Sequence, residues 1–186
     1  MDSTSSEAMK DIRTVFESVI ADGLRRESVE GATDAEIDTA LAAQGVADAP
    51  SAVREVLRLV GRSPGLWLAG SGFGVRAMTS AMKAHALATL DALPGHGIRD
   101  PASALVLVEH QAYAYHLIDG AHLGQPDPPV WLVTEGETAV ADAAWPSTAQ
   151  WFRWAAPDMS RFRERLEVLR ETGERRLPAW AEDMRL

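Results

Sequence analysis

Apolar residues in the first third of the chain recur at the spacing of amphipathic helices. Between residues 6 and 24 they stand three or four positions apart, which predicts a first helix. Thr33 and Glu36 form a capping-box pattern, and Gly45 is placed to end the second helix that this box begins. Pro50 suits the first turn of a third helix. The chain is therefore expected to open with three helices.

The period of the apolar positions changes in the middle of the chain. Residues 66–69 form a short apolar run that stops at glycines, which predicts a buried strand or extended segment. A fourth helix over residues 75–93 is expected to end at Pro94. Runs typical of neighbouring antiparallel strands follow, bounded by polar or proline-rich turns. They are residues 104–109, 112–118 and 130–134, with a further strand around Val140.

Helical spacing returns after the strands. Ser147 and Gln150 repeat the capping-box pattern, and Pro157 interrupts the helix that starts there. A last helix is predicted over residues 159–173, with arginine and glutamate alternating on its outer face. This order of elements predicts an α+β fold in which helices flank an antiparallel or mixed sheet. The expected divisions are an N-terminal helical extension over residues 1–29, a main domain over 30–156 and a C-terminal helical extension over 157–186.

Composition favours a soluble protein of the cytoplasm. The 186 residues are 46% hydrophobic and include no cysteine, which excludes a disulfide framework, a thiolate nucleophile and a sulfur-based zinc site. The first ten residues lack the apolar run of a secretory signal. No stretch approaches the roughly 20 apolar residues that a membrane-spanning helix needs. We therefore expect a cytoplasmic location and no membrane association.

The charge pattern favours a basic partner. A net charge of −9 opposes binding to nucleic-acid phosphates and to anionic membranes. Seven carboxylates and no lysine or arginine lie between Asp100 and Phe152, a stretch interpreted as one continuous negative recognition surface. The alternative, given equal weight, is that these charges only solvate loops and strand edges. The candidate partner-binding residues are Asp119, Asp127, Glu135 and Glu137, with Trp131 as an apolar anchor.

Two patterns suggest small-ligand chemistry, and neither fits it well. Residues 70–74 are glycine-rich, but Val75 stands where a dinucleotide-binding fingerprint needs its third glycine. His110, His116 and His122 are six residues apart, yet the first and last fall in expected turns, which is poor geometry for a metal site. No serine stands in a nucleophile-elbow motif, and no local pattern pairs two carboxylates. The sequence therefore favours a protein that is not an enzyme and binds no cofactor or metal.

Three stretches, taken in order, resemble a known family. Residues 33–57 contain a short helix ending near Gly45-Val46 and then a proline-started helix. Residues 106–115 read VLVEHQAYAY, a strand, a turn at His110-Gln111 and an aromatic strand. Residues 127–131 read DPPVW and precede the acidic turn Glu135-Gly136-Glu137. Together these stretches resemble the SUKH superfamily, which includes bacterial toxin-immunity proteins and fungal cell-wall-synthesis regulators.

The resemblance covers roughly residues 30–156 and implies a SUKH-like α+β domain that binds another protein. In the immunity branch of the family, the domain binds a cognate toxin and blocks it. The first expectation is therefore an immunity protein whose partner is a basic toxin domain. A regulatory scaffold for a cellular signalling protein is the second, and a small-substrate enzyme is the third. Ala112 departs from the family, which has glycine there, and the terminal extensions are expected either to pack on the core or to form a homodimer.

Overall fold

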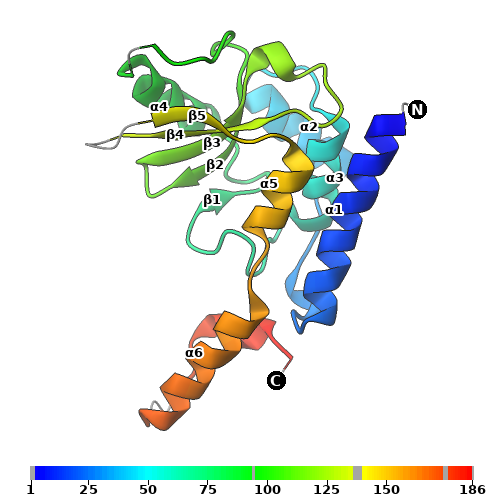
Figure 1. Ribbon diagram of the computed structural model, residues 1–186, viewed down its shortest axis with the longest axis vertical. Helices are drawn as coiled ribbons and strands as arrows, with labels where there is room; N and C mark the ends of the chain where they lie inside the picture. The colour runs from blue at the N-terminus through cyan, green and yellow to red at the C-terminus, as the bar shows by residue number, and fades with distance from the viewer. Residues whose placement is uncertain (1–2, 94, 136–139, 174–175, 186) are drawn as a thin grey trace.

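An antiparallel sheet flanked by helices forms the body of the protein (Figure 1). The computed structural model describes residues 3–93, 95–135, 140–173 and 176–185. It confirms the expected α+β fold, and all neighbouring strands of the sheet run antiparallel. The strands lie side by side in chain order: β1 (Gly72–Phe73), β2 (Leu105–His110), β3 (Ala114–Ile118), β4 (Val130–Thr134) and β5 (Val140–Trp145).

Along the described part of the chain, three α-helices come before the first strand, one lies between β1 and β2, and two follow the last strand. The α-helices are α1 (Ser3–Ala21), α2 (Asp34–Ala43), α3 (Ser51–Val60), α4 (Ser80–Asp91), α5 (Thr148–Ala155) and α6 (Met159–Glu171). The short 3-10 helices are η1 (Arg26–Ser28), η2 (Gly120–His122) and η3 (Ala179–Asp183). Thr33 and Glu36 form the expected capping box of α2, and the Ser147 side chain accepts a hydrogen bond from the Gln150 backbone at the start of α5.

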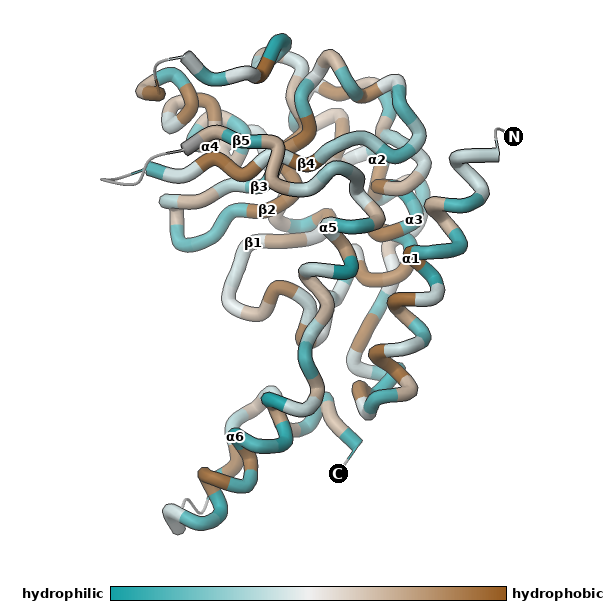
Figure 2. The backbone as a smooth tube through the Cα atoms, in the orientation of Figure 1, coloured by the Kyte–Doolittle hydropathy of each residue, from teal (hydrophilic) through white to brown (hydrophobic). Residues whose placement is uncertain are grey.

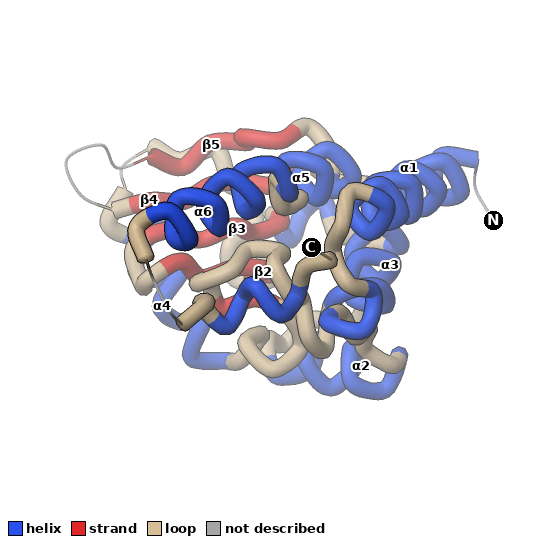
Figure 3. Tube along the Cα trace, turned by 90° about the horizontal axis from the view of Figure 1, so that it is seen from below, coloured by secondary structure: helices blue, strands red, loops and turns tan. Residues whose placement is uncertain are grey.

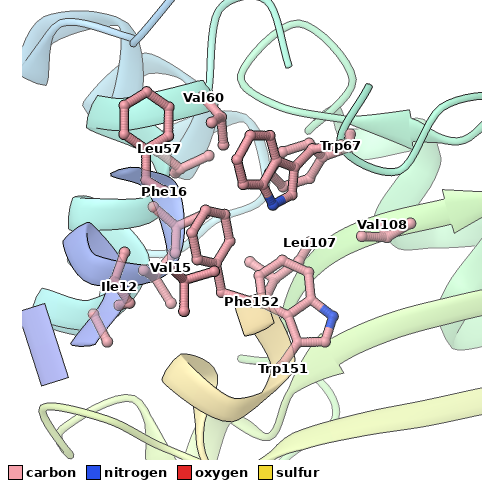
Figure 4. Packing of buried hydrophobic residues seen from close by; sticks show 14 of the residues in the cluster. Ile12, Val15, Phe16, Leu57, Val60, Trp67, Leu107, Val108, Trp151 and Phe152 are labelled. Carbon is pink, nitrogen blue, oxygen red and sulfur yellow. The ribbon is translucent and has the colours of Figure 1, made fainter. Parts of the chain in front are cut away.

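The larger hydrophobic core lies between α1, α3 and α5 and one face of the sheet (Figure 4). Figure 2 shows the alternation of hydrophobic and hydrophilic positions along α1. Trp67 is fully buried at the centre, with its ring 5.7 Å from that of Phe16 and 5.3 Å from that of Phe152. A smaller cluster fills the space between α4 and the opposite face of the sheet. Both faces are therefore covered by helices, as a sheet with two apolar faces requires.

The two terminal extensions pack on each other. The α6 helix extends away from the sheet, and the chain then returns past η3 to the end of α1 (Figure 1). Leu24 and Met184 are buried and form an isolated β-bridge there. Arg163 and Arg185 donate hydrogen bonds to the backbone carbonyls of Asp22 and Ile20. These arginines bond to carbonyls at the end of α1, where helical donors run out, and the Ile20 carbonyl also accepts from the Gly23 backbone N–H.

The strand expected over residues 66–69 is wrong. The chain makes turns there, and Leu68 has a positive φ of 51°. Leu66 and Trp67 are nevertheless buried, because the turns point both side chains into the core. The apolar run therefore reports burial and not extended backbone, an ambiguity that short apolar runs always carry.

The fourth helix begins later than expected, at Ser80 and not near residue 75. The Thr79 side chain caps it by accepting a hydrogen bond from the Met82 backbone at 3.1 Å. Ahead of it, Gly74 has a φ of +89°, and a Cβ atom there would lie 2.4 Å from the Gly61 carbonyl oxygen. The glycine-rich stretch thus serves a close backbone contact, which only glycine permits.

Gln44, at the end of α2, closes the β1 side of the sheet. The β1 strand is so short that it pairs only with Val108 and Glu109 of β2. Farther along β2, the Val106 backbone N–H donates to Gln44 Oε1, and Gln44 Nε2 donates to the Val106 carbonyl, both at 2.9 Å. The buried side-chain amide therefore replaces a missing strand and satisfies two polar groups that would otherwise be orphaned.

Candidate protein-binding surface

Residues 100–152, which contain no lysine or arginine, are called the base-free segment here. Its carboxylates do not gather on one face of the protein. Asp119 and Asp100 meet where β3 ends, whereas Glu109 is the second-last residue of β2, at the other end of the sheet. Glu135 is at that second end too, since its backbone N–H donates to the Tyr113 carbonyl. Glu137 lies outside the described residues. These four described acids are therefore divided between the two ends of the sheet, which corrects the expectation of a continuous surface.

Asp119 was expected to contact a partner, but it is completely buried. Its carboxylate accepts hydrogen bonds from the backbone N–H groups of Arg99 and Asp100 at 2.9 Å and of Ala121 at 3.1 Å. Burial opposes ionisation of this carboxyl, but the three donors outweigh burial and lower its pKa. Asp119 therefore holds two loops together and offers no charge to a partner.

The other candidates differ in accessibility. Asp127 is half-buried, and its Oδ1 accepts a hydrogen bond from the Ala149 backbone at the start of α5 at 3.0 Å. Burial raises the pKa of this carboxyl. Trp131 is half-buried and packs against the cluster beneath α4, with its ring close to Gly97. Glu135 is exposed. The structure thus leaves Asp127 and Glu135 reachable, while much of Trp131 is used in packing.

The most exposed described tryptophan is Trp154 on α5, which sequence reasoning did not single out. Trp154 is 58% exposed. Its ring centroid lies 4.6 Å from that of Trp145 and 5.6 Å from that of His116. Trp151 and Trp154 are three residues apart, so helical spacing alone could not show that the first is buried and the second exposed. Trp154 is an apolar platform held in place by neighbouring rings.

His116 supports this platform from beneath. It is buried, and its Nδ1 accepts a hydrogen bond from Trp151 Nε1 at 3.1 Å. Burial lowers the pKa of His116 to about 4. The imidazole is therefore neutral at pH 7, in a tautomer whose Nδ1 carries no proton.

A groove between α1 and α5 opens beside Trp154. Its volume is about 570 Å³, and its walls include the carboxylates of Glu7, Asp11 and Asp127 and the guanidinium of Arg153. We call this the acidic groove. Glu7 and Asp11 belong to the N-terminal extension, outside the base-free segment, and their spacing of four residues on α1 was the only signal that they share a face. The negative surface beside Trp154 is therefore assembled from two distant parts of the chain.

The described residues offer little support for a catalytic or metal site. Ser71 Oγ lies 2.8 Å from His110 Nδ1, but Glu109 faces His85 instead, with 3.7 Å between Oε1 and Nδ1. Within the described ranges, no group of three histidines or acids could hold a metal ion. Nor does any helix in those ranges have the length and apolar character to cross a membrane. The feature with the clearest chemistry is the exposed tryptophan beside the acidic groove.

Comparison with family models, with curated proteins and with solved structures found no match for this chain. The SUKH resemblance therefore stays a prediction. The argument for function accordingly depends on the chemistry of the surface around Trp154. A large exposed aromatic ring that is rigidly supported and flanked by charge is typical of a protein-binding site.

Proposed function

We propose that this protein is a non-enzymatic, cytoplasmic protein-binding domain that recognises a basic partner through Trp154 and the acidic groove. The observation that carries the proposal is the exposed Trp154 ring, held by Trp145 and His116 at the mouth of the groove. Tryptophan is enriched among the residues that dominate binding energy at interfaces. Because its neighbours already hold the ring, little side-chain entropy remains to be lost when a partner covers it.

The charges of the groove favour a partner with lysine or arginine on its surface. Glu7, Asp11 and Asp127 contribute three carboxylates against the single guanidinium of Arg153. Electrostatic complementarity of this kind speeds association and makes it sensitive to salt. A nuclease toxin carries a basic surface for phosphate, so an acidic domain that covers this surface would inhibit it. The SUKH resemblance supports the same role, that of an immunity protein neutralising a cognate toxin.

A regulatory scaffold that binds a cellular signalling protein is the alternative. It would use the same surface, so the two roles differ in what the free partner does to the cell. An immunity protein protects cells from a toxic partner, whereas a scaffold leaves their survival unchanged. An enzyme is the third candidate, and the contact between Ser71 and His110 is the observation that would favour it.

Affinity capture from the cells that make the protein tests the proposal. We expect the full chain to retain a basic protein at low salt and to release it as salt rises. Trp154→Ala should weaken retention by about 2 kcal/mol, or roughly 30-fold. Val168→Ala is the matched control, because Val168 is another exposed apolar residue, on α6. Equal retention by the two variants would contradict a binding site at Trp154.

Co-expression then separates the two roles. The captured partner is produced in a test strain with wild-type protein, with Trp154→Ala or alone. An immunity protein predicts that growth is restored by the wild type and much less by the variant. Growth unaffected by the partner alone would favour the scaffold.

A further inference from the structure

The β5 edge of the sheet is open. Figure 3 shows β5 as the outermost strand, and among the described residues only β4 pairs with it. Asp142, Ala143 and Ala144 on this strand are exposed. The backbone groups on the outer side of β5 therefore have no described strand beside them, which makes the edge a template for another extended chain.

The charged residue on this edge strand is an acid, Asp142, and not the lysine that often protects such edges. Natural sheets often guard an edge with lysine, proline or a bulge. The β5 strand has a bulge where Ala143 and Ala144 lie opposite Trp131, but its described charge is the single carboxylate of Asp142. A second copy of this chain would bring another acidic edge to it. A basic strand would instead gain from the contact, because the segment from Asp100 to Phe152 contains no lysine or arginine.

The open edge continues into the surface proposed above. The β5 strand ends at Trp145, whose ring lies 4.6 Å from that of Trp154. Trp154 in turn borders the acidic groove. An extended chain laid along β5 would therefore reach the exposed tryptophan and then the carboxylates of the groove.

We propose that the partner presents an extended basic segment, which adds to β5 as a sixth strand. Its main chain bonds to the outer side of β5, its lysine or arginine side chains face Asp142 and the acidic groove, and an apolar side chain covers Trp154. This inference rests on the proposed function, since it names how the same surface is used. Strand addition supplies affinity through main-chain hydrogen bonds and specificity through alternate side chains.

A short peptide tests strand addition on the full chain. The probe is a capped heptapeptide in which lysine alternates with valine, and its binding is followed by NMR of the labelled protein. We expect shifts and slowed amide exchange at Ala141–Ala144, together with indole shifts at Trp145 and Trp154. The same peptide with every amide N-methylated keeps its charge but cannot pair as a strand, so its affinity should fall at least about tenfold. Equal affinity of the two peptides would overturn the inference.

Two charge reversals provide the matched control on the protein. Asp142→Lys alters the β5 edge, and Glu7→Lys makes the same change in the groove; both residues are exposed. Strand addition predicts that Asp142→Lys weakens peptide binding more. Shifts confined to Glu7 and Asp11, or no β5 shifts at millimolar peptide, would overturn strand addition. The proposed function would still stand if Trp154→Ala released the captured partner, so the two failures are distinguishable.

Discussion

The two edges of the sheet are finished in opposite ways. On the β1 side, the strand is only two residues long, and the Gln44 amide fills the gap beyond it by bonding to both backbone groups of Val106. On the other side, β5 is six residues long, and its outer backbone groups face no described strand. One edge is closed by a side chain of the same molecule, and the other is the edge at which we propose that a partner binds.

Under this proposal, the two edges of the sheet serve different purposes, one stability and the other recognition. Backbone groups buried under the core need internal partners, because an unsatisfied buried group destabilises the fold. Groups at an exposed edge can bond to water and exchange that bond for a partner's. Changes at Gln44 should therefore alter stability, whereas changes along β5 and α5 should alter binding or association.

The largest expected effect is at the closed edge. Gln44→Leu keeps roughly the volume of the side chain but removes both hydrogen bonds to Val106, so the free energy of unfolding should fall by about 3 kcal/mol. Urea unfolding measures this loss. Gln125→Leu is the control, because Gln125 is exposed and should change stability by less than about 0.5 kcal/mol. Similar effects of the two substitutions would contradict the closing role of Gln44.

The next effect is the loss of stability in acid that His116, a buried residue near the β5 edge, should cause. His116 has a pKa of about 4 in the folded protein and near 6.5 in an unfolded chain. Between these values the unfolded chain binds more protons, so the stability that neutral His116 provides is complete above pH about 6.5 and is lost as pH falls to about 4.

The size of this acid effect can be isolated with a variant. Between pH about 7.5 and about 4.5, wild type should lose about 2.5 kcal/mol more stability than His116→Gln, which does not titrate. Unfolding curves at the two pH values give both losses. If wild type and His116→Gln lose the same stability, His116 is not held neutral in the folded state.

A smaller effect is expected when the carboxylate of Asp142 on β5 is removed. Asp142→Ala would leave an exposed edge of small apolar residues with no described charge, and so should increase self-association several-fold at high protein concentration. Sedimentation velocity over a concentration series measures this. Asp91→Ala, which removes an exposed acid from the end of α4, should leave association unchanged. An unchanged sedimentation profile for Asp142→Ala would mean that the edge is blocked in solution.

The smallest effect lies away from both edges, in the turn from β2 to β3. Gln111 and Ala112 have positive φ values of 48° and 59°, a conformation that side chains with a Cβ atom disfavour. Ala112→Gly should therefore stabilise the protein by about 1 kcal/mol without changing peptide binding at β5. Thermal unfolding detects the gain, and Ala112→Val should lower stability instead. Destabilisation by glycine would show that the turn is not strained.

Local signals in the sequence were sufficient for most elements of the fold. The capping residues Thr33 and Ser147 lie within three residues of the backbone groups they satisfy, so their helices could be predicted from the chain alone. The strands β2 to β5 follow from short β-type apolar runs bounded by polar or proline-rich turns. Ala112, which departs from the resembled family's glycine, nevertheless adopts a positive φ of 59°.

Features that depend on distant contacts could not be predicted. Asp119 looks like a turn residue, and only the folded chain brings the N–H groups of Arg99 and Asp100 to its carboxylate. The acidic groove joins α1 to α5, which are more than a hundred residues apart. The lack of lysine and arginine in residues 100–152 directed the recognition charges to that segment, whereas the four-residue spacing of Glu7 and Asp11 gave no sign that α1 packs beside α5.

Hydrogen exchange of the full chain, free and bound to its captured partner, tests the central claim most directly. Burial of an exposed edge by strand addition should slow the exchange of its amides. We expect new protection along β5 and at the segment of α5 that carries Trp154, with β2 beside Gln44 unchanged because that edge is already closed. Protection that appears on the β1 side or at the turn through Gln111, with none on β5 or α5, would contradict the account.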